Sequence, residues 1–161
     1  MLIAEEHDDT RLRLRTLLEL KSCQVLEARN GQEAVEIASS EQPDLILMDG
    51  SLPVIDGLEA TRRIRENVLL QEVLILALNG WGTPSFHAAA LAAGCDDCIV
   101  KPIDSVDLNR YMVLLFDRSN RESVGITNEH QKTPTLEELE SMNPVERHEL
   151  ILKHQASGNS D

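Results

Sequence analysis

Short apolar runs alternate with helix-spaced patterns from the start of this chain to about residue 117. Two of the runs, 44–48 and 73–78, contain mostly large aliphatic residues, which is typical of strands buried on both faces. Between the runs, apolar residues recur at the spacing of an amphipathic helix. The pattern predicts strands over 2–4, 24–28, 44–48, 73–78 and 98–100. It predicts helices over 9–20, 32–40, 58–66, 84–93 and 104–116.

This alternation of strands and helices predicts an α/β domain. Strands separated by a helix pair in parallel through right-handed crossovers, and the helices cover both faces of the sheet. In such sheets the functional crevice lies beyond the carboxyl ends of the strands. The side chains that directly follow each strand are therefore the first candidates for a functional site.

Charged or amide side chains follow four of the five predicted strands. Glu5 and Glu6 follow the first, Asp49 the third, Asn79 the fourth and Lys101 the fifth. Carboxylates held this close raise one another's pKa, and a divalent cation is the usual remedy. Oxygen ligands favour a hard ion, Mg²⁺ or Mn²⁺. A carboxylate beside such an ion and an ammonium group can attack a phosphoryl group, because both cations neutralise charge in the transition state.

Four segments around these residues resemble the conserved blocks of receiver domains of two-component response regulators. The segments are MLIAEEHDD, DLILMDGSLPVIDG, LILALNG and CIVKPID, in the order and spacing of that family, and they cover about residues 1–117. The resemblance implies a doubly wound, five-stranded parallel sheet with the flavodoxin-like strand order 2-1-3-4-5 and helices on both faces. It also implies that a sensor histidine kinase or a histidine phosphotransfer protein phosphorylates Asp49.

By the same resemblance, the site holds Mg²⁺ or Mn²⁺. The ligands would be Glu6, Asp49 and the backbone carbonyl of Ser51, with Glu5 nearby through water. The family usually has aspartate in the acidic pair, and each glutamate here is one methylene longer. Ordering these longer side chains costs additional conformational entropy, so we expect the metal to bind weakly.

Phosphoryl contacts are implied at the ends of the fourth and fifth strands. Lys101 would pair with the phosphoryl oxygens and Asn79 would donate a hydrogen bond to one of them. The Lys101–Pro102 peptide would be cis, since proline permits that isomer. Ser51 and Trp81 occupy the positions that modulate loss of the phosphoryl group in receivers.

Further departures from the family pattern keep three functions open. Asn79 replaces a serine or threonine, and Cys98 replaces the aromatic residue of the family's switch. The first hypothesis is a phosphoacceptor receiver, and the second is a degenerate receiver that acts as a phosphorylation-independent interaction module. The third is a phosphatase with an aspartate nucleophile, which would require a catalytic acid or base where this chain has Ser51.

Three other features have a structural and a functional interpretation. His7 is either a loop histidine in solvent, which we favour, or a metal or phosphate contact. Cys95 and Cys98 have CxxC spacing, but one such pair without a nearby histidine favours two structural cysteines over zinc. Trp81, the only tryptophan, either covers apolar surface or borders the site, with equal weight.

Composition limits the partners. The chain has 15 basic and 28 acidic residues, a net charge of −13, which argues against nucleic acid or an anionic membrane surface as a partner. Aromatic residues make up only 2%, too few for a base-stacking platform. An odd number of cysteines and the lack of a secretory signal or an 18-residue apolar stretch favour a cytoplasmic protein with reduced thiols.

The length of 161 residues allows one domain with an appendage. We expect a receiver domain over 1–118, then a polar linker and a short helical tail over 119–161. That tail is too small and too acidic for a DNA-binding output domain. The sequence therefore predicts a signalling protein without metabolic activity, which acts on an unknown downstream protein by direct contact.

Overall fold

The computed structural model describes residues 1–123 and contains one parallel sheet of five strands. The strands are β1 (Leu2–Ala4), β2 (Leu26–Ala28), β3 (Leu45–Asp49), β4 (Leu74–Asn79) and β5 (Asp97–Val100). Their order across the sheet is β2-β1-β3-β4-β5, and every neighbouring pair is parallel. The predicted strand order is therefore confirmed.

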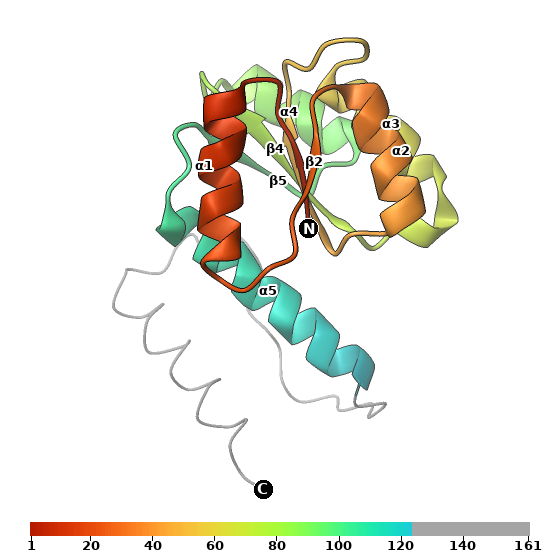
Figure 1. Ribbon diagram of the computed structural model, residues 1–161. Coiled ribbons are helices and arrows are strands. Elements are labelled where there is room, and N and C mark those ends of the chain that lie inside the picture. The colour runs from red at the N-terminus through yellow and green to blue at the C-terminus, as the bar shows by residue number, and fades with distance from the viewer. Residues whose placement is uncertain (124–161) are drawn as a thin grey trace, which may run out of the picture. The chain divides into compact units, whose positions relative to one another are not determined.

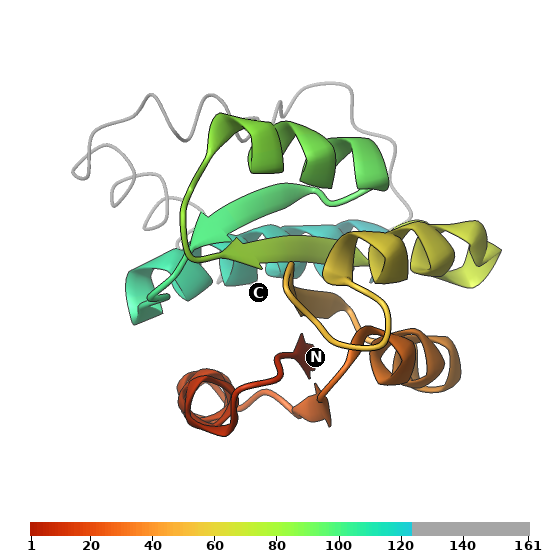
Figure 2. The ribbon, with the colours of Figure 1, turned by 90° about the horizontal axis from the view of Figure 1, so that it is seen from above.

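Helices cover both faces of this sheet. They are α1 (Asp8–Glu19), α2 (Gly31–Glu41), α3 (Gly57–Glu66), α4 (Pro84–Ala93) and α5 (Ser105–Ser123), with a 3₁₀ turn, η1, at Val68–Leu70. Figures 1 and 2 show α1 on one face, with the start of α5, and α2, α3 and α4 on the other. On the first face, the Arg13 guanidinium donates a hydrogen bond to the carbonyl of Ile103, just before α5.

The core consists of aliphatic side chains from the strands, as the apolar runs predicted. All residues of β3 are buried, and so are all residues of β4 before Asn79. Alternate strand residues face opposite sides of a sheet, so both layers of helices pack on aliphatic surface. Ile46, Met48 and Ile75 belong to the apolar cluster that also contains Ala60 and Ile64 of α3.

Side chains and a glycine fix several helix ends. Asn30 and Asp56 accept hydrogen bonds from the backbone amides of the third residue of α2 and α3, the usual arrangement of an N-cap. Gly94 ends α4 with a φ of 110°, a left-handed conformation that favours glycine. Helix α1 differs, because its N-cap residue His7 makes no side-chain cap hydrogen bond.

Three elements differ from the prediction. Strand β2 begins at Leu26, not at residue 24, because its neighbour β1 offers only three residues to pair with. The turn η1 was not predicted, and α5 continues to Ser123, past the predicted end at residue 116. The segment after residue 116 is polar without an apolar period, but it contains no proline or glycine before Gly125. Nothing in it therefore interrupts the backbone hydrogen bonds of a helix. The rest of the predicted linker and tail, 124–161, lies outside the described residues.

Contacts along the chain define a compact unit, Met1–Leu115, which contains the whole sheet, and a second unit, Phe116–Asp161. Within the described part of the chain, no helix combines the length and apolar character that a membrane crossing requires.

Candidate functional site

Three charged side chains meet at the carboxyl ends of β1, β3 and β5. The Lys101 ammonium lies 2.5 Å from Glu5 Oε2 and 3.3 Å from Asp49 Oδ2. The Glu5 side chain is completely buried and that of Asp49 nearly so, whereas Lys101 is partly exposed. Lys101 thus bridges two carboxylates that the sheet holds away from bulk water.

Lys101 also decides the ionisation of Glu5. Burial by itself raises the pKa of this carboxyl, but hydrogen bonds from Lys101 and from the His7 backbone amide, together with the Lys101 charge, lower it below its ordinary value. The expectation that close carboxylates raise one another's pKa is therefore wrong for Glu5. The reason is that an ammonium group, rather than another carboxylate, is its nearest charged neighbour.

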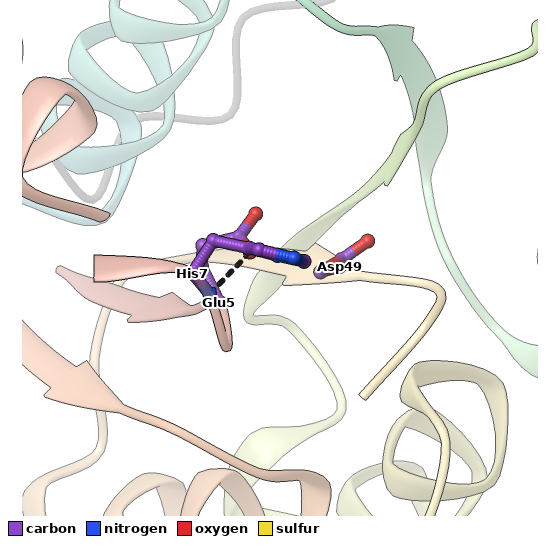
Figure 3. Close-up of side chains that lie close together, drawn as sticks. All are labelled: Glu5, His7 and Asp49. Atoms are coloured by element: carbon purple, nitrogen blue, oxygen red, sulfur yellow. Dashed lines mark hydrogen bonds and ion pairs between the residues drawn. The ribbon is translucent and has the colours of Figure 1, made fainter. Parts of the chain in front are cut away.

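The acidic pair is divided between the site and solvent. Glu6 is exposed. Glu5 instead forms a cluster with His7 and Asp49, in which each residue offers one potential ligand atom and these atoms all lie within 4.8 Å of one another. Among residues 1–123 this is the only such group of histidine, cysteine or acidic side chains. Figure 3 shows the three side chains close together, with the hydrogen bond between His7 and Glu5 as a dashed line. The structure thus brings together Glu5, Asp49 and Lys101, but not Glu6.

Arg11 is a residue of this site that the sequence analysis missed. Its guanidinium is buried and donates hydrogen bonds to the backbone carbonyls of Glu5, at 2.9 Å, and Glu6, at 3.1 Å. It also pairs with Asp8 and with Glu27, the latter at 3.4 Å. Arg11 therefore fixes the loop between β1 and α1. The helical spacing of residues 11, 14 and 18 could have indicated that Arg11 lies on the buried face of the helix.

The loop after β3 positions Asp49. The backbone amide of Ser51 donates a hydrogen bond of 3.3 Å to Asp49 Oδ1. Gly57 lies against the Asp49 backbone so closely that a Cβ at position 57 would fall 2.0 Å from the Asp49 carbonyl oxygen. Only glycine permits this approach, so Gly57 allows the loop to fold back beside Asp49. The role of the Ser51 carbonyl as a metal ligand stays a prediction.

The end of β4 forms the remaining border of the site. The Asn79 side-chain oxygen accepts a hydrogen bond of 3.2 Å from the Trp81 backbone amide, and the Asn79 carbonyl accepts one of 2.8 Å from the Lys101 amide. Trp81 is 88% exposed. Its interpretation as a cover over apolar surface is therefore wrong. The Lys101–Pro102 peptide is cis.

The CxxC pair shows the features of structural cysteines. Cys95 is buried, and its sulfur lies 3.6 Å from the hydroxyl of Thr61. Burial raises the pKa of Cys95, and burial with the neighbouring Cys95 and Asp97 raises that of Cys98 to about 11. Neither thiol belongs to a group of potential metal ligands among residues 1–123.

Comparison with known proteins agrees with this geometry. The family model of the response regulator receiver domain matches residues 1–112. The chain therefore belongs to the receiver domain family of response regulators, which are signalling domains that interact with histidine kinases and other proteins.

Two relatives illustrate the range of the family. The chain is 31% identical over 103 residues to the polar-differentiation response regulator DivK of Brucella anthropi, a match that covers 64% of this chain and 84% of DivK. It is 30% identical over 132 residues to the transcriptional regulatory protein SrrA of Staphylococcus aureus, a match that covers 82% of this chain and 54% of SrrA.

Solved structures include close matches to the fold. The receiver domain of a sensor histidine kinase from Pseudomonas aeruginosa PAO1 is 30% identical with a TM-score of 0.67, and the match covers 72% of this chain and 95% of that one. That structure contains a magnesium ion coordinated in the active-site cleft. A receiver domain from a histidine kinase of Syntrophus aciditrophicus is 29% identical with a TM-score of 0.65, and covers 84% of this chain and 96% of its own.

Proposed function

We propose that this protein accepts a phosphoryl group on Asp49 from a sensor histidine kinase or a histidine phosphotransfer protein, and that it signals by contact with a downstream protein. The observation that carries the proposal is the bridge that Lys101 forms between buried Glu5 and Asp49. It places one ammonium group beside the carboxylate of Asp49, at the strand ends where ligands of such sheets bind.

The chemistry follows from this arrangement. An Asp49 oxygen attacks phosphorus and forms a P–O bond, while the P–N bond of a phosphohistidine breaks and the imidazole keeps the electron pair and takes up a proton. Lys101 lies 3.3 Å from Asp49 Oδ2, so its charge stabilises the oxygens that gain charge in the transition state. The reaction ends with a phosphorylated protein, which is consistent with a signalling domain.

The residues present fit a hard divalent ion. Glu5 and Asp49 supply carboxylate oxygens within 4.8 Å of each other, the ligand type that Mg²⁺ and Mn²⁺ prefer. When bound, such an ion supplies positive charge to the phosphoryl oxygens. We propose that Mg²⁺ or Mn²⁺ is the cofactor, with weak affinity.

Labelling with a small acyl phosphate in the presence of Mg²⁺, followed by intact-mass measurement, tests the function. We expect one phosphoryl adduct on the wild-type chain and none on Asp49→Asn, with the fold of the variant intact by circular dichroism. Asp44→Asn is the matched control, since Asp44 precedes the amino end of β3, opposite the site, and we expect it to be labelled like the wild type. Equal labelling of Asp49→Asn would contradict the assignment of the phosphorylated residue.

A degenerate receiver is the second candidate, because Glu6 is exposed and outside the cluster. In that case the protein would bind its partner without phosphorylation. Wild-type protein that shows neither an adduct nor metal binding would favour this candidate.

A further inference from the structure

His7 turns its ring toward the site. It precedes α1 as the N-cap residue but makes no side-chain cap hydrogen bond, so the ring does not serve the helix end. Although the side chain is 73% exposed, its Nδ1 lies 3.1 Å from Glu5 Oε1. The His7 backbone amide donates to the same oxygen at 2.9 Å. The two oxygens of Glu5 therefore face different partners, Lys101 on one side and His7 on the other.

The spacing of the cluster suits ligands of one ion. Two ligand atoms in neighbouring octahedral positions, with bonds of about 2.1 Å, lie about 3.0 Å apart, and in opposite positions about 4.2 Å apart. His7 Nδ1 and Glu5 Oε1 form a hydrogen bond of 3.1 Å, and the same separation fits two ligands in neighbouring positions when the ring takes the tautomer with its proton on Nε2. Because the potential ligand atoms of Glu5, His7 and Asp49 all lie within 4.8 Å, small side-chain adjustments suffice for a shared ion.

We propose that His7 is a ligand of the divalent ion at this site and gives it a preference for transition-metal ions over Mg²⁺. This inference rests on the metal site of the proposed function. Glu6, the residue that the sequence favoured as a ligand, is exposed and outside the cluster, so His7 is the third donor beside Glu5 and Asp49. Neutral imidazole offers a nitrogen lone pair without adding charge.

The predicted selectivity follows from ligand chemistry. Mg²⁺ binds oxygen and keeps several waters, so a nitrogen ligand adds little to its affinity. Imidazole suits later transition-metal ions, and affinity for a given site rises from Mn²⁺ to Co²⁺. A site with one imidazole and two carboxylates should therefore bind Co²⁺ more tightly than Mn²⁺, and Mn²⁺ more tightly than Mg²⁺.

Metal titration of the full chain tests the inference without an activity assay. Isothermal calorimetry gives the affinities for Mg²⁺, Mn²⁺ and Co²⁺, and spin-echo resonance of bound Mn²⁺ detects coupling to a nitrogen ligand. In His7→Gln we expect the nitrogen coupling to disappear and the Co²⁺-to-Mg²⁺ affinity ratio to fall by at least about tenfold, since changes to residues that only orient metal ligands already cost about that much in affinity.

His87→Gln is the matched control, because His87 is also exposed and near a carboxylate, Asp97 at 3.6 Å, but lies outside the cluster. It should keep both the nitrogen coupling and the affinity ratio. An unchanged ratio in His7→Gln, or nitrogen coupling that persists there, would overturn the inference. Phosphodonor labelling of the wild type in the same preparation separates the two proposals. If the protein is labelled but the nitrogen coupling does not depend on His7, only the role of His7 is overturned. If the protein neither is labelled nor binds metal, the proposed function is overturned as well.

Discussion

The two sides of the site differ in how firmly the structure holds them. On one side, which we call the charged side, Glu5, Asp49 and Lys101 are largely buried and joined by ion pairs of 2.5 and 3.3 Å. On the other, the open side, Asn79 binds the backbone of Trp81, and the indole is 88% exposed. Because charges interact more strongly when they are shielded from water, the charged side contributes more to stability than the open side. Substitutions there should affect stability, whereas substitutions on the open side should not.

The largest expected effect is that of Lys101→Met. The variant leaves a completely buried carboxylate at Glu5 without its ammonium partner, and breaking such a buried pair costs about 3 kcal/mol. Urea unfolding at neutral pH measures the loss. The double variant Glu5→Gln/Lys101→Met should lose less than Lys101→Met alone, because one carboxylate, Asp49, is then left without the ammonium instead of two.

Lys21→Met is the matched lysine control, since its ammonium bonds to the neutral side chain of Asn109. We expect it to cost less than about 1 kcal/mol, because this contact is exposed to solvent. Equal losses of unfolding free energy in Lys101→Met and Lys21→Met would show that the charged side contributes no more to stability than ordinary surface does.

Acidification should weaken the charged side in a defined range. The pKa of Glu5 is lowered below its ordinary value of 4.5, so its ionised form contributes stability that is fully present above that pH and is lost as the pH falls through the folded-state value. Free energies of unfolding between about pH 3 and pH 7 should therefore fall less steeply on the acid side for Glu5→Gln than for wild type. Glu6→Gln, a change at the exposed neighbour, is the control. If the free energies of unfolding of Glu5→Gln and wild type change in parallel with pH, the partners of Glu5 do not lower its pKa in the folded protein.

The smallest effect is expected on the open side, for Trp81→Ala. An 88% exposed side chain has little contact to lose, so the free energy of unfolding should change by less than about 0.5 kcal/mol. Trp81 is the only tryptophan, so quenching of the wild-type fluorescence by acrylamide reports its exposure directly. Quenching much weaker than that of free tryptophanamide would mean that the indole is covered and the open side is not open.

Much of the fold could be predicted from the sequence, because local patterns decide it. The aliphatic runs of β3 and β4 are buried along their length, and the alternation with helices forces parallel pairing. The placement of Asp49 and Lys101 at strand ends follows directly from where the apolar runs stop. The extension of α5 to Ser123 could not be predicted in this way, since no apolar period marks its last turns.

The composition of the site depended on tertiary structure. The sequence determined that two glutamates follow β1, and residues adjacent in extended chain point in opposite directions. It could not determine which of them faces Lys101, which lies 96 residues from Glu5 along the chain. Only packing of β1 beside β3, with the β1–α1 loop held by Arg11, decided that Glu5 is buried and Glu6 exposed. The same loop brings the ring of His7 to Glu5, two residues away, but only the sheet places this pair beside Asp49 at the end of β3. Proximity of side chains across strands depends on where the sheet places the strand ends, and local pattern contains no such information.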